Sequence, residues 1–339
     1  MSKALSDAGT PAVQEWPAVD IVVVSRGRHE LLRKAVALVS GVDYPSDKMR
    51  IVVIEETDEP QPLAVDGVDY RAIPMRDLGF AHARNEALRC VVAPVVVFTD
   101  DDCVVERDWL KEIVGPLVRD QSVQAVAGAV LVPSCGPVGK CENVLGFPGG
   151  GLKTLHAADG ELVHRKTFST CNCAVRRDAI EACGGFDERL RIGGEDEALS
   201  RRIVANGGVI VFCPSARVLH RPRDGLCRVF LWFIRRGRAR AAAIRAGVAE
   251  QSAVELLTNS PIVRALVLLA LCLLPVVPVV PFVLTIALAY YVFILHRFRW
   301  ARRHCGIGAL LLLPLVKVTM DIGMDFGMLM GMRGEAGRS

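Results

Sequence analysis

Short apolar runs alternate with amphipathic stretches through the first third of the chain. Three runs rich in Val and Ile end in polar or acidic residues, which is typical of buried strands: residues 19–28, 49–57 and 93–102. Three further stretches space their apolar side chains three and four positions apart, as an α-helix does: residues 29–42, 78–91 and 108–118. Strands and helices that alternate in this order predict a parallel sheet covered by helices on both faces.

The middle of the chain continues the pattern less regularly. Residues 123–133 predict another strand, whereas the Gly-rich stretch that follows, to about residue 166, has no clear period and is interpreted as loop. Residues 169–208 predict a short strand, a helix, a Gly-rich turn and a second helix that starts near Glu195, and residues 209–223 predict a closing strand. We therefore expect an α/β domain over residues 19–225, after a disordered lead-in at residues 1–18.

The last quarter of the chain is much more apolar. Hydrophobic residues make up 51% of the whole sequence, and the mean hydropathy is +0.33. Residues 265–295 carry no charge, and as one helix they would extend about 46 Å, whereas a single span needs about 30 Å. Pro275, Pro278 and Pro281 interrupt the run near its middle. We expect a transmembrane hairpin over residues 261–296, while length alone also allows one long span.

Basic residues flank this run on both sides. Residues 217–245 hold nine arginines, and residues 296–304 hold four more. Basic flanks tend to remain in the cytoplasm, so two of them require an even number of crossings, as a hairpin provides. The Arg-rich segment at residues 226–260 is interpreted as interfacial helices that lie on anionic lipid. These features predict a multi-pass protein of the inner (cell) membrane whose α/β domain faces the cytoplasm.

Residues 305–332 predict a third transmembrane helix. The segment contains Lys317, Asp321 and Asp325, and a spacing of four places all three on one helical face. Charges within a bilayer cost a few kcal/mol each unless they are paired or face a cavity. The sequence leaves three roles open: pairing with one another, binding a neighbouring helix, or contact with a lipid phosphate.

Charge and cysteine content narrow the class of protein. The net charge of +4 is small for 339 residues, and the membrane already explains the basic clusters, so no nucleic-acid partner is expected. The eleven cysteines include no CxxC pair, which argues against a zinc site. Their odd number argues against a disulfide framework, and we expect reduced thiols in a cytosolic compartment.

Polar and charged residues cluster where the first three predicted strands end. They are Ser25, Arg26, Glu55, Glu56, Asp100, Asp101 and Asp102. Ligands of parallel α/β sheets bind at the carboxyl ends of the strands, so this edge is the candidate site. Mg²⁺ or Mn²⁺ prefers oxygen ligands that it shares with substrate phosphates. We expect the alternate residues Asp100 and Asp102 to face one point, with Asp101 directed elsewhere, toward a sugar; the alternative is a solvated acidic turn that caps the helix at residues 108–117.

Five motifs, in order and sensibly spaced over residues 19–240, resemble those of the inverting glycosyltransferases of family 2. They are VVVSRGR, RIVVIEET, HARNEAL, VVFTDDDCVVERDWL and GGFDERLRIGGEDEALSRRI. The resemblance implies the GT-A nucleotide-diphospho-sugar transferase fold, an α/β fold with a Rossmann-like, mostly parallel sheet, here followed by an α-helical membrane region. It also implies a nucleotide-sugar donor and a divalent cofactor, Mg²⁺ or Mn²⁺.

Carried over residue by residue, the resemblance implies a donor site. Ser25, Arg26 and Arg28 would line the nucleotide pocket. Glu55 stands where the family commonly has an aspartate that binds the base, and this departure leaves the identity of the nucleotide open.

Further basic residues would hold the diphosphate. Arg84 and Asn85 would steady the loop near it. Arg235 and Arg238 match two arginines of a signature in membrane-bound relatives, and would cover the diphosphate of the donor or of a lipid acceptor. Ala239 replaces the tryptophan of that signature, which argues against processive chain growth.

The same resemblance assigns the metal ligands and the base. Asp100 and Asp102 match the DXD metal motif, and His220 would help to bind the metal or the diphosphate. Asp196 in GGED matches the catalytic base. Gly193 and Gly194 let the backbone approach a ligand, and the start of a helix stabilises a carboxylate, although an ordinary helix N-cap explains the same residues.

The sequence thus predicts a membrane-anchored enzyme that transfers a sugar to a hydroxyl of a lipid, lipid-linked or other cell-envelope acceptor, with Asp196 as general base. One alternative is a non-catalytic membrane scaffold, because Glu55 and Ala198 depart from the family pattern. Another is a prenyl-diphosphate-binding enzyme, because DDDCVVE is similar to an aspartate-rich motif. The sugar, the acceptor and the oligomeric state are left open.

Overall fold

The fold is given by a computed structural model that describes residues 15–63, 65–249, 260, 263 and 279–333. Its centre is a nine-stranded mixed sheet with the order β3-β2-β1-β4-β8-β6-β9-β5, in which β7 pairs with β9. The strands are β1 (Val19–Arg26), β2 (Met49–Glu56), β3 (Val68–Ile73), β4 (Val95–Asp100), β5 (Cys103–Val105), β6 (Val123–Leu131), β7 (Val163–Arg165), β8 (Asn172–Arg176) and β9 (Val209–His220). As expected, β1 is parallel to both β2 and β4. β8 lies antiparallel between β4 and β6.

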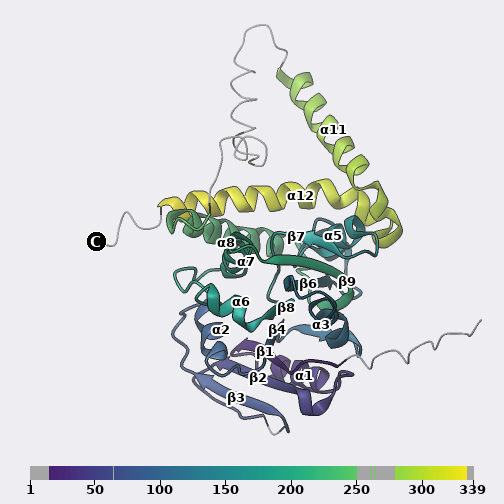
Figure 1. The fold of residues 1–339 in the computed structure, drawn as a ribbon. Helices are drawn as coiled ribbons and strands as arrows, with labels where there is room; N and C mark the ends of the chain where they lie inside the picture. The colour runs from purple at the N-terminus through teal and green to yellow at the C-terminus, as the bar shows by residue number, and fades with distance from the viewer. Residues whose placement is uncertain (1–14, 64, 250–259, 261–262, 264–278, 334–339) are drawn as a thin grey trace, which may run out of the picture.

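Helices cover both faces of the sheet and add a further layer above one edge (Figure 1). The helices are α1 (His29–Ser40), α2 (Phe80–Leu88), α3 (Trp109–Arg119), α4 (Pro137–Val144), α5 (Gly151–Ala158), α6 (Arg177–Ala182), α7 (Glu195–Ala205), α8 (Leu226–Arg245), α11 (Val279–Arg297) and α12 (Arg302–Arg333), with 3-10 turns at Ser46–Lys48 and Arg299–Ala301. Leu32 and Trp109 bring α1 and α3 into the core on one face, and Ala83 and Leu199 bring α2 and α7 into the core on the other.

The structure adds elements that the sequence pattern did not predict. β3 is a partly exposed strand that pairs only with β2 along the described sheet, so it lacks the apolar run of a buried strand. The stretch interpreted as loop contains α4 and α5, which is a correction. α4 forms because Cys141 and Val144 are buried in a cluster with α8 and α12, and this contact is invisible to local periodicity.

α8 and α12 pack against each other along much of their length. Gly323, Gly327 and Gly331 of α12 face α8, and a Cβ added at Gly327 would lie 2.1 Å from the carbonyl oxygen of Ile234. A Cβ added at Gly237 of α8 would likewise collide with the carbonyl oxygen of Met324. The two backbones therefore touch at a seam that only glycine fits.

Two of the described helices are long and apolar enough to cross a membrane, α11 and the segment that contains α12. α11 rises from one end of α12, away from the sheet (Figure 1). The first limb of the expected hairpin lies outside the described residues. Within α12, Lys317 Nζ lies 2.5 Å from both carboxylate oxygens of Asp321, and Asp325 accepts a hydrogen bond from Ser260. These charges therefore have partners within the protein. The described cysteines are free, and most are buried.

Candidate active site

Strand register brings the predicted residues to one edge of the sheet. Val24 of β1 lies opposite Asp100 of β4, and Ser25 lies opposite Glu55 of β2. After the acidic turn the chain continues as β5, which is antiparallel to β9 and sets Cys103 opposite His220. The acids that end β4 are therefore enclosed between the end of β1 and the end of β9.

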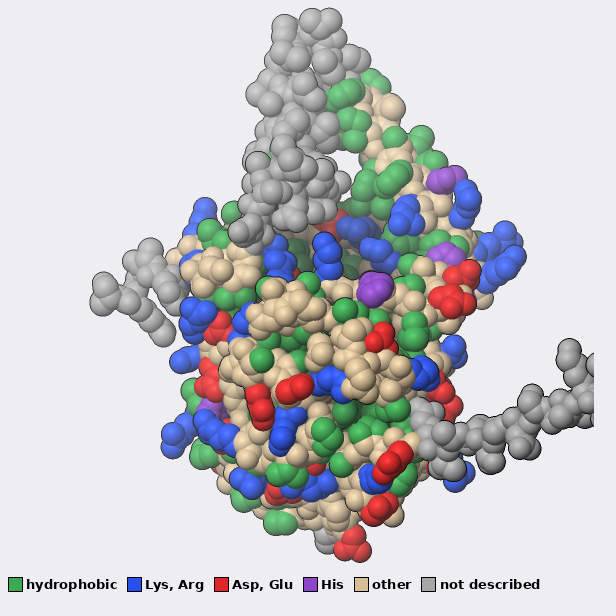
Figure 2. Space-filling view, in the orientation of Figure 1, with side chains coloured by type: hydrophobic (Ala, Val, Ile, Leu, Met, Phe, Trp, Pro, Cys, Tyr) green, Lys and Arg blue, Asp and Glu red, His purple; other side chains and the backbone are tan. Residues whose placement is uncertain are grey.

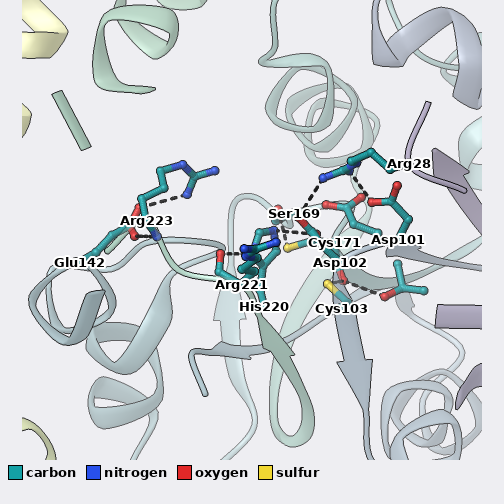
Figure 3. A network of polar contacts seen from close by, with 12 residues as sticks. Arg28, Asp101, Asp102, Cys103, Glu142, Ser169, Cys171, His220, Arg221 and Arg223 are labelled. Carbon is teal, nitrogen blue, oxygen red and sulfur yellow. Dashed lines mark hydrogen bonds and ion pairs between the residues drawn. The ribbon is translucent and has the colours of Figure 1, made fainter. Parts of the chain in front are cut away.

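Asp101 points into the protein. Its carboxylate accepts a hydrogen bond of 2.7 Å from the Ser25 hydroxyl. It also forms an ion pair with Arg28, which Figure 3 shows. Arg28 also pairs with Asp102, at 3.1 Å. Burial raises the pKa of Asp101 to about 6, against the opposing effects of Ser25 and Arg28. Because it is held by β1, Asp101 does not face the cavity described below, which differs from the expectation that it points toward a sugar.

Asp102 and His220 form the most suitable cation site among the described residues. His220 Nε2 lies 3.4 Å from Asp102 Oδ1, and this oxygen is buried without a hydrogen-bond partner. His220 Nδ1 lies 3.0 Å from the carbonyl oxygen of Arg221, and Nε2 faces Asp102. With the ring proton on Nδ1, Nε2 and the carboxylate oxygen of Asp102 are two acceptors that could share a cation.

The neighbouring thiol is poorly suited to bind that cation. Cys103 Sγ lies close enough to Asp102 and His220 to complete a three-residue cluster. It instead contacts the carbonyl oxygen of Cys171 at 3.6 Å, and burial raises its pKa well above the usual value, so it remains a neutral thiol. The oxygen and imidazole donors that remain fit a hard ion such as Mg²⁺ or Mn²⁺.

Arg84 links the acidic turn to the start of α7. Its Nη1 lies 2.5 Å from Glu195 Oε1 and its Nη2 lies 3.5 Å from Asp100 Oδ1. The guanidinium lies over the rings of Phe80 and Phe186, with centroid distances of 5.5 and 5.8 Å. This buried arginine, together with Arg28, supplies the positive charge that three consecutive aspartates need.

Asp196 occupies the first turn of α7. The helix begins after Gly194, whose φ of 93° is readily adopted only by glycine, and Asp196 Oδ1 accepts a hydrogen bond of 2.8 Å from the Glu197 amide. Burial, and then the charge of Glu195, raise the pKa of Asp196 to about 6, with Arg84 acting against them. A carboxylate with such a pKa is suited to accept a proton near neutral pH.

One cavity of about 870 Å³ joins these groups. It extends from the strand ends to α8 and α12. Eight of the predicted residues line it: Arg26, Arg28, Arg84, Asp100, Asp102, Asp196, His220 and Arg235. The cavity therefore brings the candidate base and the candidate cation site into the same chamber.

Five predicted residues lie behind this lining. Ser25 and Asp101 bond to each other, as described. Glu55 is buried and accepts a hydrogen bond of 2.7 Å from the Tyr70 hydroxyl, with His29 Nδ1 at 3.3 Å. Asn85 exchanges two hydrogen bonds of 2.9 Å with the backbone of Phe186, which ties α2 to the loop before α7. The backbone of Arg238 packs against Gly331 of α12.

The cavity also contains a basic and aromatic wall that sequence reasoning missed. Arg223 lies 3.7 Å above the ring centroid of Trp232 and pairs with the buried Glu142 at 3.0 Å. Arg236 lies over Trp232 and Phe147, at 4.9 and 5.0 Å. Trp232 is seven residues before Ala239, so both lie on one face of α8, and both line the cavity. The spacing of Trp232 and Ala239 on α8 was visible in the sequence and could have indicated this wall. Glu142 and Phe147, in contrast, belong to the stretch that was interpreted as loop, so their contacts with Arg223 and Arg236 could not be predicted.

Comparisons with known proteins give a family and a fold. A family model described as "Glycosyltransferase like family 2" matches residues 17–242. The chain is 28% identical over 226 residues to the O-antigen biosynthesis protein RfbC of Myxococcus xanthus, covering 61% of this chain and 18% of that protein. It is 28% identical to the cellulose synthase catalytic subunit of Komagataeibacter sucrofermentans (51% and 24% covered), and 29% identical to the succinoglycan biosynthesis protein ExoM of Rhizobium meliloti (60% and 66%). The chain thus spans less than two thirds of each of these relatives.

A solved structure shares the fold over most of the chain. It is the mannosyltransferase PcManGT of Pyrobaculum calidifontis, in complex with GDP-Man and Mn²⁺. The TM-score is 0.61 at 20% sequence identity, and the match covers 91% of this chain and 87% of that one. The likeness confirms a GT-A fold with C-terminal helices, as predicted.

Proposed function

The chain belongs to glycosyltransferase family 2, and from that premise we propose that it transfers a sugar, with inversion, from a nucleoside-diphosphate sugar to a hydroxyl of a lipid or lipid-linked acceptor of the cell envelope. One observation carries the proposal. Asp196 and the Asp102–His220 pair line one cavity, and Arg84 connects the two sides through Glu195 and Asp100. The prenyl-diphosphate alternative requires acidic residues on helices that line an apolar cavity. Asp100 instead ends the strand β4, which does not favour that alternative.

The proposed reaction is a single displacement at the anomeric carbon of the donor. Asp196 accepts the proton of the acceptor hydroxyl, whose oxygen forms a bond to the anomeric carbon from the side opposite the leaving group. The bond from that carbon to the diphosphate oxygen breaks, and the nucleoside diphosphate leaves with the electron pair. Three of the arginines in the cavity lining would hold the diphosphate: Arg26, Arg28 and Arg235.

Asp102 and His220, with Asp100 beside them, would hold a divalent cation. The buried oxygen of Asp102, which has no hydrogen-bond partner, and His220 Nε2, 3.4 Å from it, support this placement. When bound there, Mg²⁺ or Mn²⁺ neutralises charge on the diphosphate as the leaving group departs. Asp101 acts from behind this site, because its bonds to Ser25 and Arg28 hold the acidic turn in place.

We further propose that the enzyme is anchored in the inner membrane with its catalytic domain on the cytoplasmic side. The apolar helices α11 and α12 and the basic residues around them support this location. The catalytic cavity reaches Met324 and Met328 of α12. An acceptor with an apolar portion would meet apolar side chains there, while its hydroxyl would lie near Asp196.

Purified protein incubated with a panel of nucleotide sugars, lipid acceptors and Mn²⁺ tests the proposal. Transfer to a lipid acceptor, with an anomeric configuration opposite to that of the donor in the product, is the expected result. A retained configuration would contradict the single displacement. Transfer only to soluble sugars would contradict the lipid acceptor, and no turnover of any donor would favour the scaffold alternative.

A further inference from the structure

α12 has two faces of different character. Its buried positions point toward the rest of the protein, whereas six large apolar side chains on the opposite face are between 41% and 54% exposed: Ile307, Leu311, Leu315, Ile322, Phe326 and Leu329. At 100° per residue these six side chains form one continuous stripe along the helix. The stripe extends over 23 residues, or about 33 Å, and about half of each side chain is exposed; α11 meets it at Leu311, whose carbonyl oxygen accepts a hydrogen bond from the Tyr291 hydroxyl.

The buried face of α12 belongs to the catalytic domain. Cys141 of α4 contacts the carbonyl oxygen of Ala309 at 3.0 Å, near one end of the helix. The glycine seam with α8 extends from Gly323 to Gly331 at the other end. Between them, Met324 and Met328 form part of the wall of the catalytic cavity. α12 is therefore fixed to the domain at both ends.

This attachment restricts how α12 meets a membrane. Its partner α8 carries exposed arginines at positions 228 and 238, and Arg235 and Arg236 of the same helix line the catalytic cavity. A charged side chain near the centre of a bilayer is energetically costly unless it is paired or faces water. If α12 crossed the bilayer, α8 and its arginines would enter the hydrocarbon with it.

We propose that α12 lies in the plane of the membrane surface, with its exposed stripe buried among the lipids, and does not form a third span. α11 is the element suited to cross: its 19 residues extend about 28 Å, close to the thickness of the hydrocarbon. In Figure 1, α12 extends across the top of the domain, and α11 rises from its end at a steep angle to it. The proposal concerns how the domain is seated and does not depend on the identity of the reaction.

The surface around α12 indicates a bilayer rich in anionic lipid as the partner. Exposed arginines stand at the junction of α11 and α12: Arg297, Arg299, Arg302 and Arg303. Figure 2 shows Lys and Arg side chains gathered at the level of α8 and α12, and hydrophobic side chains over α11. Basic residues beside an apolar stripe match lipid headgroups beside acyl chains.

Depth measurements along α12 test the proposal with the full chain. A fluorescent amino acid is incorporated in place of Ile307, Leu315, Ile322 or Leu329, one at a time. The protein is reconstituted in vesicles of phosphatidylglycerol and phosphatidylcholine, which carry a nitroxide quencher either near the headgroup or near the end of the acyl chain. Val104, an exposed apolar residue of β5, is the control position and should be quenched by neither lipid.

We expect all four positions to be quenched more by the shallow nitroxide than by the deep one, to a similar extent. A spanning α12 predicts a different profile, in which positions 315 and 322 are quenched most by the deep nitroxide and positions 307 and 329 by the shallow one. That profile would overturn the proposal. Absence of quenching at all four positions would also overturn it, and would indicate that a second copy of the chain covers the stripe.

Discussion

Arg84 and Glu195 form a buried ion pair, with 2.5 Å between Nη1 and Oε1. The pair joins α2 to the first turn of α7, and the second amino group of the same guanidinium reaches Asp100 at 3.5 Å. One side chain therefore connects the helix that carries the proposed base with the end of β4, where the acidic turn that contains Asp102 begins. The guanidinium of Arg84 thus adds a charged link between two elements that also share one hydrophobic cluster.

Replacing Arg84 with Met should destabilise the protein strongly. The change leaves Glu195 buried and unpaired, and breaking a buried pair from one side costs about 3–5 kcal/mol. For a domain of this size that corresponds to a melting temperature lowered by roughly 6–20 °C. Thermal unfolding in detergent measures it, with Arg89→Ala as the control, because Arg89 pairs with Glu86 on the surface. Equal melting temperatures for the two variants would contradict a structural role for the Arg84 pair.

Replacing Asp196 with Asn should lower kcat by about 10²–10⁴-fold while leaving donor affinity unchanged, because an amide accepts no proton in the reaction. Steady-state kinetics and calorimetry with the nucleoside diphosphate separate the two effects. Asp178→Asn changes an exposed acid of α6 outside the cavity lining and serves as the control. Turnover close to that of the unmodified enzyme would exclude Asp196 as the base.

The pH dependence of the reaction should follow Asp196. Its pKa is raised to about 6, and only the deprotonated carboxylate accepts a proton. We therefore expect kcat/KM to rise as pH increases through about 6 and to become level above it. The residual activity of Asp196→Asn should lack this rise. A rise centred near pH 4, the ordinary range of an aspartate, would show that the site does not perturb this group.

Metal binding should depend on Asp102 and His220 but not on Cys103. Asp102→Ala and His220→Ala should each weaken Mn²⁺ binding by at least about 10-fold, because each removes a donor. Cys103→Ala keeps both donors and removes only a neutral thiol, so its affinity should stay the same. Titration of Mn²⁺ followed by electron paramagnetic resonance measures all three. A Cys103→Ala variant that loses affinity would reveal a thiolate site of another kind.

The glycine seam predicts opposite outcomes for two similar substitutions in α12. Gly327→Ala places a methyl group against the backbone of Ile234, which should cost about 1–3 kcal/mol or separate the helices. Gly308→Ala meets no atom within 4 Å and should stabilise the helix by about 0.5–1 kcal/mol. Thermal unfolding compares the two. If both variants were equally stable, the contact between α8 and α12 would not be tight.

The sequence predicted the parts of the fold whose signal is local. The apolar run of β1 and the acids that end β4 reveal a buried strand and its carboxyl edge, and β1 is parallel to both neighbours as expected. The chemistry at that edge follows from the same pattern, so the donors later found in the cavity were already candidates.

Features that depend on distant contacts were not predictable in this way. α4 is helical because Val144 meets α8 and α12, which follow in the chain by more than 80 residues. The direction of Asp101 depends on Ser25, 76 positions away. The composition of α12 predicts a membrane helix. Its orientation relative to the membrane depends on which of its faces α8 covers, and mean hydropathy cannot show this because it averages over both faces.

The placement of Met324 and Met328 in the cavity wall has a practical consequence. A fragment cut after α8 to obtain a soluble enzyme would keep every proposed catalytic residue and yet lose one side of the reaction chamber. Water would then enter beside Asp196, and donor hydrolysis would compete with transfer. If the proposed reaction takes place in this cavity, α12 forms part of the reaction chamber, and we expect that an unrelated anchor would not replace it.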